Sequence, residues 1–459
     1  MAIKNYNQIQ SFGDFLQYIS GDQKSGFQVS QKGNQPYAKD LDLFEKFHQT
    51  HPSLYGLLGT LSEINEEARV KILYFLLKSS WANCTPSERQ TFWKVLEFLH
   101  EILPADKILN VYLSLRRDRV NRKHLTRAAL RFLFQHENTK ELIYFRRRSV
   151  QDILEHVLGK STALTILRIF QKENLEEQEI EYLKHHLFRF VELNKEGRGL
   201  FVKAFQARQR GRQPAFYHVG HKKQLEKIFP PKRLSKTISV THRGDIAANL
   251  VHIYRGGNNP QLEEALYNEV EKAVKGLPKF NGKVALVLDA SASTRGFGER
   301  EFALISQNVA FKLTLEKLVE DLVVIPVGGV GELHFPSGGS DLAMGLIEAL
   351  EQTPDLVLMV SDGYENRNSG DLEKVVKTLP QLDIQTPVFF VQSQFYYKDD
   401  LSQRCPAPSL PELGFWHQDD FENVLVHSFL EASELNTEGL EAFLNEKLSE
   451  RKQQLNVTT

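Results

Sequence analysis

The sequence has little of what would place a protein outside the cell or in a membrane. It contains only two cysteines, Cys84 and Cys405, among 459 residues, which excludes a disulfide framework and a four-cysteine zinc site. No run of about 18 apolar residues occurs, so a transmembrane helix is excluded. The first residues lack the apolar core of a secretory signal peptide. We therefore expect a cytoplasmic protein with no membrane partner.

Motifs of the common enzyme classes are also missing. The patterns GxxxxGK[ST], HExxH, CxxC and GxSxG do not occur. The run Gly328-Gly-Val-Gly331 lacks the third glycine of a dinucleotide-binding loop and precedes an apparent strand. Nothing in the sequence fixes the geometry that a serine–histidine–aspartate triad needs. We therefore expect that the protein is not an enzyme.

The charge of the chain is balanced overall but divided unequally. The net charge is −1, with 57 Lys+Arg against 58 Asp+Glu. Residues 281–459 carry 13 Lys+Arg and 28 Asp+Glu, whereas residues 1–280 carry 44 and 30. The two halves therefore have opposite charge, which indicates different partners for each half or attraction between them.

Helical periodicity dominates the first half of the chain. A capping box at Thr85 and Glu88, with Pro86 at the first helical position, predicts a helix that ends before Pro104. Similar short helices repeat from about Lys39 to Phe205 without a strict sequence period. This pattern favours a HEAT-like helical repeat region, and an irregular helical bundle is the alternative.

Short apolar runs separated by amphipathic stretches fill the second half. The runs are Val284–Leu288, Leu322–Ile325, Leu356–Val360 and Val388–Val391. Strands that alternate with helices predict a parallel, doubly wound, Rossmann-like α/β sheet. The expected domains are a polar arm (1–37), a helical repeat region (38–260), the α/β domain (276–435) and a C-terminal helix or tail (436–459). We expect a fragment that begins near residue 276 to fold alone.

Oxygen-bearing side chains gather in three loops of this α/β half. The segment Asp289-Ala-Ser291-Ala-Ser293 follows the first strand, Ser340 precedes a helix, and Asp362 follows the third apolar run. Ligands of such sheets bind beyond the carboxyl ends of the strands. Hard oxygen donors without His or Cys suit Mg²⁺ most, with Mn²⁺ or Ca²⁺ as alternatives. The competing explanation is that these residues only cap helices.

The segment Asp289–Ser293 resembles the DxSxS signature of von Willebrand factor A domains. The resemblance covers about residues 280–430 and implies a metal-ion-dependent adhesion site. By motif, Asp289, Ser291 and Ser293 match its first loop and Asp362 its last aspartate, while Ser340 stands where the family usually has Thr. Such a site implies an acidic protein partner that completes the coordination of the cation.

A basic helical region followed by such a domain resembles the Ro autoantigen family, whose helical part is called TROVE. The resemblance implies that the helical half binds structured RNA or single-stranded RNA ends. It rests on architecture and charge in the helical half, where no signature motif occurs.

Two basic segments are candidates for RNA contacts. Residues 116–148 hold eleven Lys+Arg, and residues 195–243 hold thirteen with interleaved aromatic residues. Arginine and aromatic side chains together suit phosphate neutralisation and base stacking. The competing explanation is a solvated basic surface, or one docked on the acidic half. The candidates are Arg119, Lys123, Arg127 and Arg131, whose spacing of four predicts one helix face, and Arg208, Arg210, Arg212, Phe216, Tyr217, His221, Lys222, Lys223, Lys232 and Arg233.

These observations predict an RNA-binding protein of Ro-like type with a divalent-cation site in its second half. The alternative is a von Willebrand A scaffold that works with an AAA+ ATPase and binds no RNA.

Overall fold

The computed structural model describes residues 9–21, 26–27, 38–206, 229, 245–257, 260–365, 367–394, 404–432 and 437–456. The chain forms two compact units. The helical unit consists of Met1–Gln10, Phe15–Pro230 and Leu444–Thr459, and the sheet unit consists of Ser11–Asp14 and Pro231–Phe443. Among the described helices, none combines the length and the apolar character that crossing a bilayer requires.

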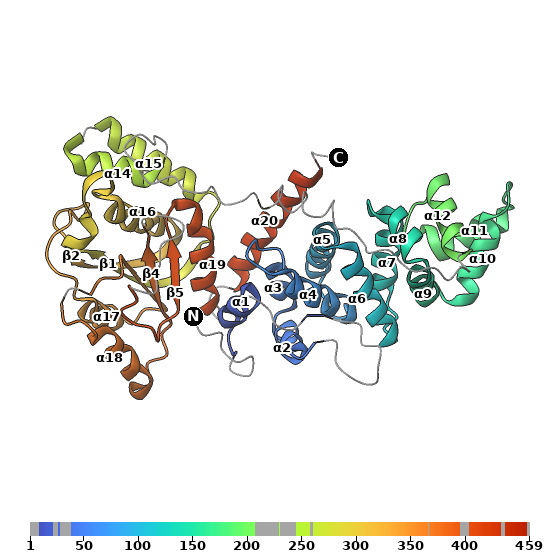
Figure 1. Ribbon diagram of the computed structural model, residues 1–459, viewed down its shortest axis with the longest axis horizontal. Helices are drawn as coiled ribbons and strands as arrows, with labels where there is room; N and C mark the ends of the chain where they lie inside the picture. Colours follow the sequence, from blue (N-terminus) through green and yellow to red (C-terminus); the bar gives the residue numbers. More distant parts are fainter. Residues whose placement is uncertain are drawn as a thin grey trace. The chain divides into compact units, whose positions relative to one another are not determined.

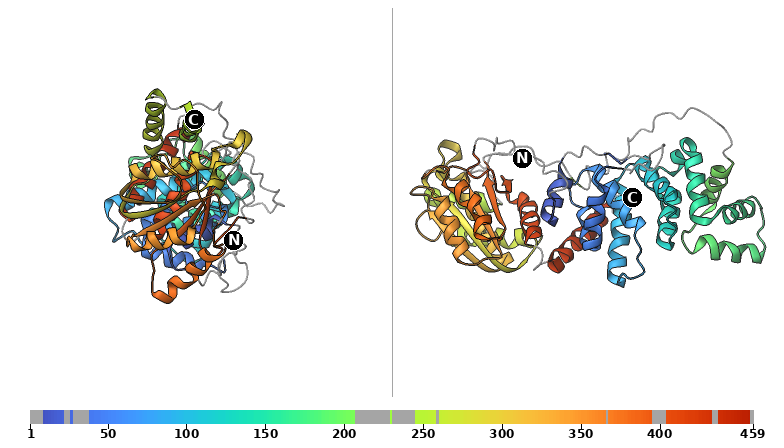
Figure 2. Two further views of the ribbon diagram at one scale, coloured as in Figure 1. Left: turned by 90° about the vertical axis from the view of Figure 1, so that its left-hand side faces the viewer. Right: turned by 90° about the horizontal axis from the view of Figure 1, so that it is seen from below.

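The helices α2 to α9 of the helical unit follow one another in space in chain order, whereas α12 returns to contact α8 and α9 (Figure 1 and Figure 2). Packing contacts join α2 to α4, α3 to α5, α4 to α6, α7 to α9 and α10 to α12. The predicted capping box at Thr85 and Glu88 is confirmed at the start of α5. The elements are α1 (Phe12–Ser20), α2 (Leu41–Thr50), α3 (Pro52–Leu58), α4 (Glu66–Lys78), α5 (Pro86–Ile102), α6 (Ala105–Arg117), α7 (Lys123–Gln135), α8 (Thr139–Phe145), α9 (Arg147–Leu158), α10 (Lys160–Phe170), α11 (Glu177–Leu183), η2 (Lys184–Phe188), α12 (Lys195–Phe205) and the end of α20 (Thr437–Asn456).

The segment predicted as a polar arm contains the helix α1. Its side chains Phe12, Phe15, Leu16 and Ile19 are buried. They recur at intervals of three and four residues, which places them on one side of a helix. The ring of Phe15 stacks on that of Phe47, with centroids 4.4 Å apart. Four apolar side chains are therefore enough to order part of a segment that is otherwise polar.

The sheet unit contains five parallel strands in the order β2-β1-β3-β4-β5. Four of them coincide with the predicted apolar runs, and β5 is additional. The elements are α14 (Ile246–His252), η3 (Ile253–Gly257), α15 (Pro260–Val274), β1 (Phe280–Ala290), η4 (Ala292–Arg295), η5 (Gly298–Arg300), α16 (Ala303–Leu318), β2 (Val319–Gly328), α17 (Leu342–Glu351), β3 (Leu356–Ser361), α18 (Asp371–Thr378), η6 (Leu379–Leu382), β4 (Val388–Ser393), β5 (Glu412–Phe415), η8 (Gln418–Asp420) and α19 (Phe421–Glu431).

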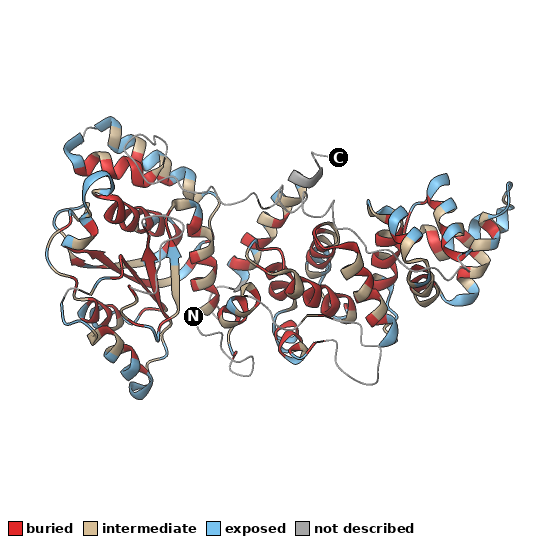
Figure 3. Ribbon diagram, in the orientation of Figure 1, coloured by how far each residue is buried: buried red, intermediate tan, exposed pale blue. Residues whose placement is uncertain are grey.

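Alternate residues of β1 enter two separate cores, one on each face of the sheet. Leu286 and Leu288 pack in the core formed with α14, α15, α16 and α19. Ala285 and Val287 pack in the core formed with α17 and α18. The strands β3 and β4 are buried along their whole length, and β1 is buried from Val284 to Ala290 (Figure 3). The result is an α/β sheet covered by helices on both faces, as the continuous apolar runs predicted.

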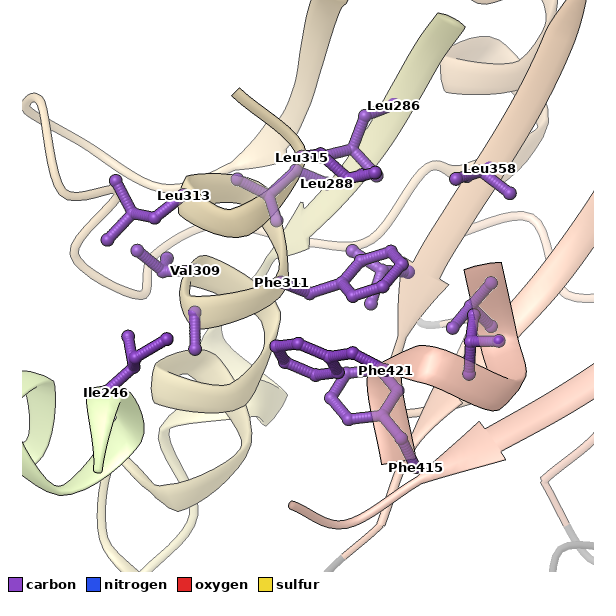
Figure 4. Packing of buried hydrophobic residues seen from close by; sticks show 14 of the residues in the cluster. Ile246, Leu286, Leu288, Val309, Phe311, Leu313, Leu315, Leu358, Phe415 and Phe421 are labelled. Carbon is purple, nitrogen blue, oxygen red and sulfur yellow. The ribbon is translucent and has the colours of Figure 1, made fainter. Parts of the chain in front are cut away.

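The helices α14 and α15 belong to the core of the sheet unit, although the predicted boundary at residue 276 excludes them. Ile246, Leu250, Leu266 and Val270 lie in the same cluster as the strands. In Figure 4 the side chain of Ile246 points toward α16. Helical periodicity shows that a helix has an apolar face, but it does not show which core that face joins. The prediction from sequence therefore assigned α14 to the helical half.

We therefore expect a fragment of residues 245–443 to unfold cooperatively and at a higher temperature than a fragment of residues 276–443. Each fully buried aliphatic side chain contributes about 1.5–3 kcal/mol, and the shorter fragment loses six buried ones, Val251 and Ile253 in addition to the four named above. Thermal melts followed by circular dichroism measure the difference. Equal midpoints for the two fragments would show that α14 and α15 are dispensable.

Two histidines in the interior of the helical unit are expected to make its stability depend on pH. Burial lowers the pKa of His100 to about 3 and that of His136 to about 4, and His136 also lowers the pKa of His100. The folded protein therefore keeps both rings neutral at a pH where the unfolded chain binds protons. Stability is complete above the unfolded value of about 6.5 and is lost as the pH falls toward 4.

Between pH 7 and pH 5, the free energy of unfolding of the helical unit is expected to fall by about 1–2 kcal/mol for each such histidine. Its thermal transition therefore shifts to lower temperature. His100→Gln should reduce this pH dependence, because the ring that resists protonation is gone. His185→Gln is the control, since His185 is exposed. Melting curves at the two pH values test this, and a pH-independent midpoint in the wild type would contradict it.

Candidate functional site

The sheet brings the predicted oxygen-bearing loops together at the carboxyl ends of adjacent strands. Asp289 is the penultimate residue of β1, and Asp362 directly follows β3, which pairs with β1. The hydroxyl of Ser361 donates a hydrogen bond of 2.5 Å to Oδ2 of Asp289. The second loop joins them because the amide of Ala292 donates to the carbonyl of Gly338 over 3.0 Å. Three loops distant in sequence therefore share one site.

The three predicted serines lie within this site. Ser291 and Ser293 have hydroxyl oxygens 3.0 Å apart. The hydroxyl of Ser340 donates to the carbonyl of Tyr364 over 2.7 Å, which ties the second loop to the third. Helix capping accounts for the neighbouring Asp341, whose side chain accepts from the amide of Met344. It does not account for Ser340, which makes no cap of this helix.

The two carboxylates are buried close to each other. Asp289 and Asp362 are each 0% exposed. Burial, and then the charge of Asp362, raises the pKa of Asp289 to about 7. Burial also raises the pKa of Asp362, although a hydrogen bond from the amide of Tyr364 favours its charged form. Two carboxyl groups in this position destabilise each other when both are ionised, and a cation would relieve that repulsion.

The residues present fit a hard divalent cation. Oδ2 of Asp362 is buried and has no hydrogen-bond partner within the described part of the chain. The remaining donors are hydroxyl oxygens, which suit Mg²⁺ or Ca²⁺ better than zinc. Within the described ranges, no group of three or more His, Cys, Asp and Glu side chains is placed to hold a metal. A cation here would therefore depend on the serine hydroxyls for part of its coordination.

Side chains that the sequence did not single out support this site. Arg404 and Gln392 both donate to the carbonyl of Asp362, over 3.1 and 3.2 Å. Asn308 of α16 donates to the carbonyl of Asp289 over 2.9 Å. Gly363 has φ of +88° and packs against Arg404 and Gln392, so a side chain there would be strained and would clash. Ser361 and Gly363 had a signal in the sequence, because they flank Asp362 at the end of a predicted strand, whereas Arg404, Gln392 and Asn308 had none.

The basic residues of the helical unit are placed differently from the prediction. Lys123, Arg127 and Arg131 lie on α7, one helical turn apart. Arg119 does not share this helix, so the prediction of one face of four residues was wrong at this position. The helix α6 ends at Arg117, and Arg119 adopts a left-handed backbone with φ of 56° in the turn that follows.

Two of the arginines on α7 contact the neighbouring helix α5. The guanidinium carbons of Arg127 and Arg131 lie 5.0 and 5.7 Å from the ring centroid of Trp93. Arg131 also forms an ion pair of 2.7 Å with Glu97. Lys123 is exposed. The face therefore combines cations with a half-buried indole.

The other predicted RNA contacts lie outside the described residues. They are Arg208, Arg210, Arg212, Phe216, Tyr217, His221, Lys222, Lys223, Lys232 and Arg233. Their assignment stays a prediction from sequence.

The comparisons with known proteins find a structural likeness but no family match. No protein-family model matches the chain, and no curated protein matches it either. The chain is similar to a solved structure, the Ro (RSR) protein of Deinococcus radiodurans, with 12% sequence identity and a TM-score of 0.33. The match covers 92% of this chain and 96% of that one.

Proposed function

We propose that this chain is a non-enzymatic RNA-binding protein of Ro-like type. In this proposal the helical unit is a HEAT-like repeat region that holds structured RNA or a single-stranded RNA end. The sheet unit is a von Willebrand factor A domain that holds Mg²⁺ and, through it, an acidic protein partner. The protein acts in the cytoplasm.

The observation that carries the RNA proposal is the cationic and aromatic surface on α5 and α7. Lys123, Arg127 and Arg131 place three positive charges along one helix, and Trp93 offers a flat ring beside two of them. Positive charge supplies a large share of the free energy of nucleic-acid binding, and aromatic or guanidinium planes stack on unpaired bases. Like charges one turn apart repel each other, so an anionic partner relieves a local cost.

The buried carboxylates support the metal-dependent part of the proposal. Asp289, Asp362 and the hydroxyls of Ser291, Ser293 and Ser340 would hold the cation. A bound cation supplies positive charge that neutralises the two carboxylates and attracts an acidic group of a partner. Asp362, with one buried oxygen that has no hydrogen-bond partner in the described structure, is the residue best prepared to receive it.

The alternative is a scaffold that works with an AAA+ ATPase and uses its helical unit to bind protein. Both proposals share the metal site, so the helical unit distinguishes them. The first experiment is the ratio of absorbance at 260 nm to that at 280 nm for untagged protein purified at low salt. If the protein binds RNA, this absorbance ratio should be higher than that of protein alone. Treatment with ribonuclease followed by a high-salt wash should then return the ratio to the value of protein alone. A ratio that is low from the start would favour the scaffold.

A further inference from the structure

The C-terminal helix α20 lies along α5 in the helical unit. The hydroxyl of Thr91 donates to the side chain of Asn445 over 3.1 Å, and Lys94 donates to the hydroxyl of Ser449 over 3.3 Å. One turn further, Glu97 pairs with Lys452. The residue numbers of the contacting pairs increase together along α5 and α20, so the two helices run parallel. The helix α5 therefore contacts both α20 and α7.

Glu97 joins the two flanking helices through one carboxylate. Its Oε1 accepts from Arg131 of α7 over 2.7 Å, and its Oε2 pairs with the ammonium group of Lys452 of α20. The side chains are partly open to solvent, with exposures of 37% for Glu97, 32% for Arg131 and 20% for Lys452. Two cations from distant parts of the sequence thus contact one carboxylate that solvent can reach, and the partly buried Glu101 is a second carboxylate within electrostatic range of Lys452.

We propose that the RNA surface continues from α7 across α5 onto α20, and that Glu97 holds the place of an RNA phosphate in the free protein. This inference rests on the proposed RNA binding. A carboxylate and a phosphate accept the same hydrogen bonds from a guanidinium and an ammonium group. Without Glu97 the two cations would repel each other, so the carboxylate keeps them arranged for an anion. An incoming phosphate takes over these contacts, and Glu97 competes with it.

Lys94 extends this cationic surface. Its ammonium group contacts the neutral hydroxyl of Ser449, so its charge stays available to a phosphate. Lys94 and Lys452 both lie at the contact between α5 and α20. Net charge could not reveal this surface, since the half of the sequence that supplies Lys452 is strongly acidic.

The inference predicts that removing an internal ion pair improves binding. Glu97→Gln in the full-length protein should bind a labelled hairpin RNA with a single-stranded uridine tail about threefold more tightly or better, because the competing anion is gone. The joint replacement of Lys94→Gln and Lys452→Gln should weaken binding by about tenfold and reduce the salt slope by about 1.4, for two lost phosphate contacts. Fluorescence anisotropy at several salt concentrations measures both.

Matched controls separate the local effect from net charge. Glu196→Gln also removes one carboxylate that pairs with a lysine, Lys140, elsewhere in the helical unit. Lys172→Gln removes an exposed ammonium group that pairs with Glu176 and Glu179. Both controls should bind the RNA within about twofold of the wild type, since only long-range and screened interactions change.

The outcomes distinguish this inference from the function on which it rests. Absence of RNA binding by the wild type would refute both the proposed function and this inference. Wild-type binding together with a Glu97→Gln variant that binds no better than Glu196→Gln would overturn the inference alone. The same follows if the Lys94 and Lys452 replacements leave affinity and slope unchanged, a test that holds even if Glu97→Gln destabilises α20. If poly-glutamate competes with the labelled RNA as strongly as poly-uridylate does, the surface binds acidic proteins, and the inference is overturned as well.

Discussion

Asp289→Asn is expected to abolish the binding of Mn²⁺ that we predict for the wild-type protein in calorimetric titration. The substitution keeps the size of the side chain but removes one of the two carboxylate charges that would hold the cation. In the wild type, affinity should fall as the pH drops below about 7, because Asp289 then carries a proton that must leave before the cation binds.

The same variant should be more stable than the wild type when no metal is present. The pKa of Asp289 is raised, so the folded protein holds a proton that the unfolded chain releases above pH 4. The stability of the metal-free wild type therefore falls as the pH rises from about 4 through 7, and Asn removes this cost. Melting in EDTA at pH 8 should show a higher midpoint for Asp289→Asn.

Asp383→Asn is the matched control for both measurements. Asp383 is exposed in a turn with φ of 56°, a conformation that Asn also adopts. This control should bind Mn²⁺ like the wild type. Equal Mn²⁺ binding by Asp289→Asn and the wild type would refute the assignment of the site.

Charge reversal on α7 is expected to weaken RNA binding by about tenfold to a hundredfold at low salt. The joint variant Lys123→Glu and Arg127→Glu replaces two cations one turn apart with two anions, and it leaves the ion pair of Arg131 intact. The salt slope should fall by about 1.4, as two phosphate contacts to a single strand are lost. Mn²⁺ binding should not change, because Asp289 lies in the other unit.

The control for this variant makes the same change of charge in the sheet unit. Lys374→Glu and Lys377→Glu reverse two exposed lysines on α18. RNA binding should stay within about twofold of the wild type. An equal loss in both variants would mean that net charge, and not the surface of α7, controls binding.

The strands were predictable because a buried parallel strand leaves a continuous apolar run. Val284–Leu288 and Leu356–Val360 have no polar interruption, and both became central strands. The strand β5 escaped prediction because it has only four residues, of which only Phe415 is buried. The position of α20 was also beyond the sequence, since its contacts with α5 join residues more than 350 positions apart.

The metal-site candidates came together because the ends of adjacent parallel strands meet at one edge of the sheet. Position in the sheet therefore brings Asp289 to Asp362 without any further signal. Arg404 gave no such signal, because it stands in an aperiodic stretch before β5. On α7 the spacing of four located Lys123, Arg127 and Arg131, but spacing cannot show that Arg131 pairs with Glu97 or that Arg127 lies over Trp93.

The salt dependence of RNA binding by the full-length wild-type protein tests the central claim most directly. A labelled hairpin RNA with a single-stranded tail is titrated by filter binding at salt concentrations from about 50 to about 200 mM. If several phosphate contacts hold the RNA, the logarithm of the association constant should fall linearly with the logarithm of the salt concentration, with a slope of about −2 or steeper. Absence of binding at the lowest salt, or binding that ignores salt, would contradict the account.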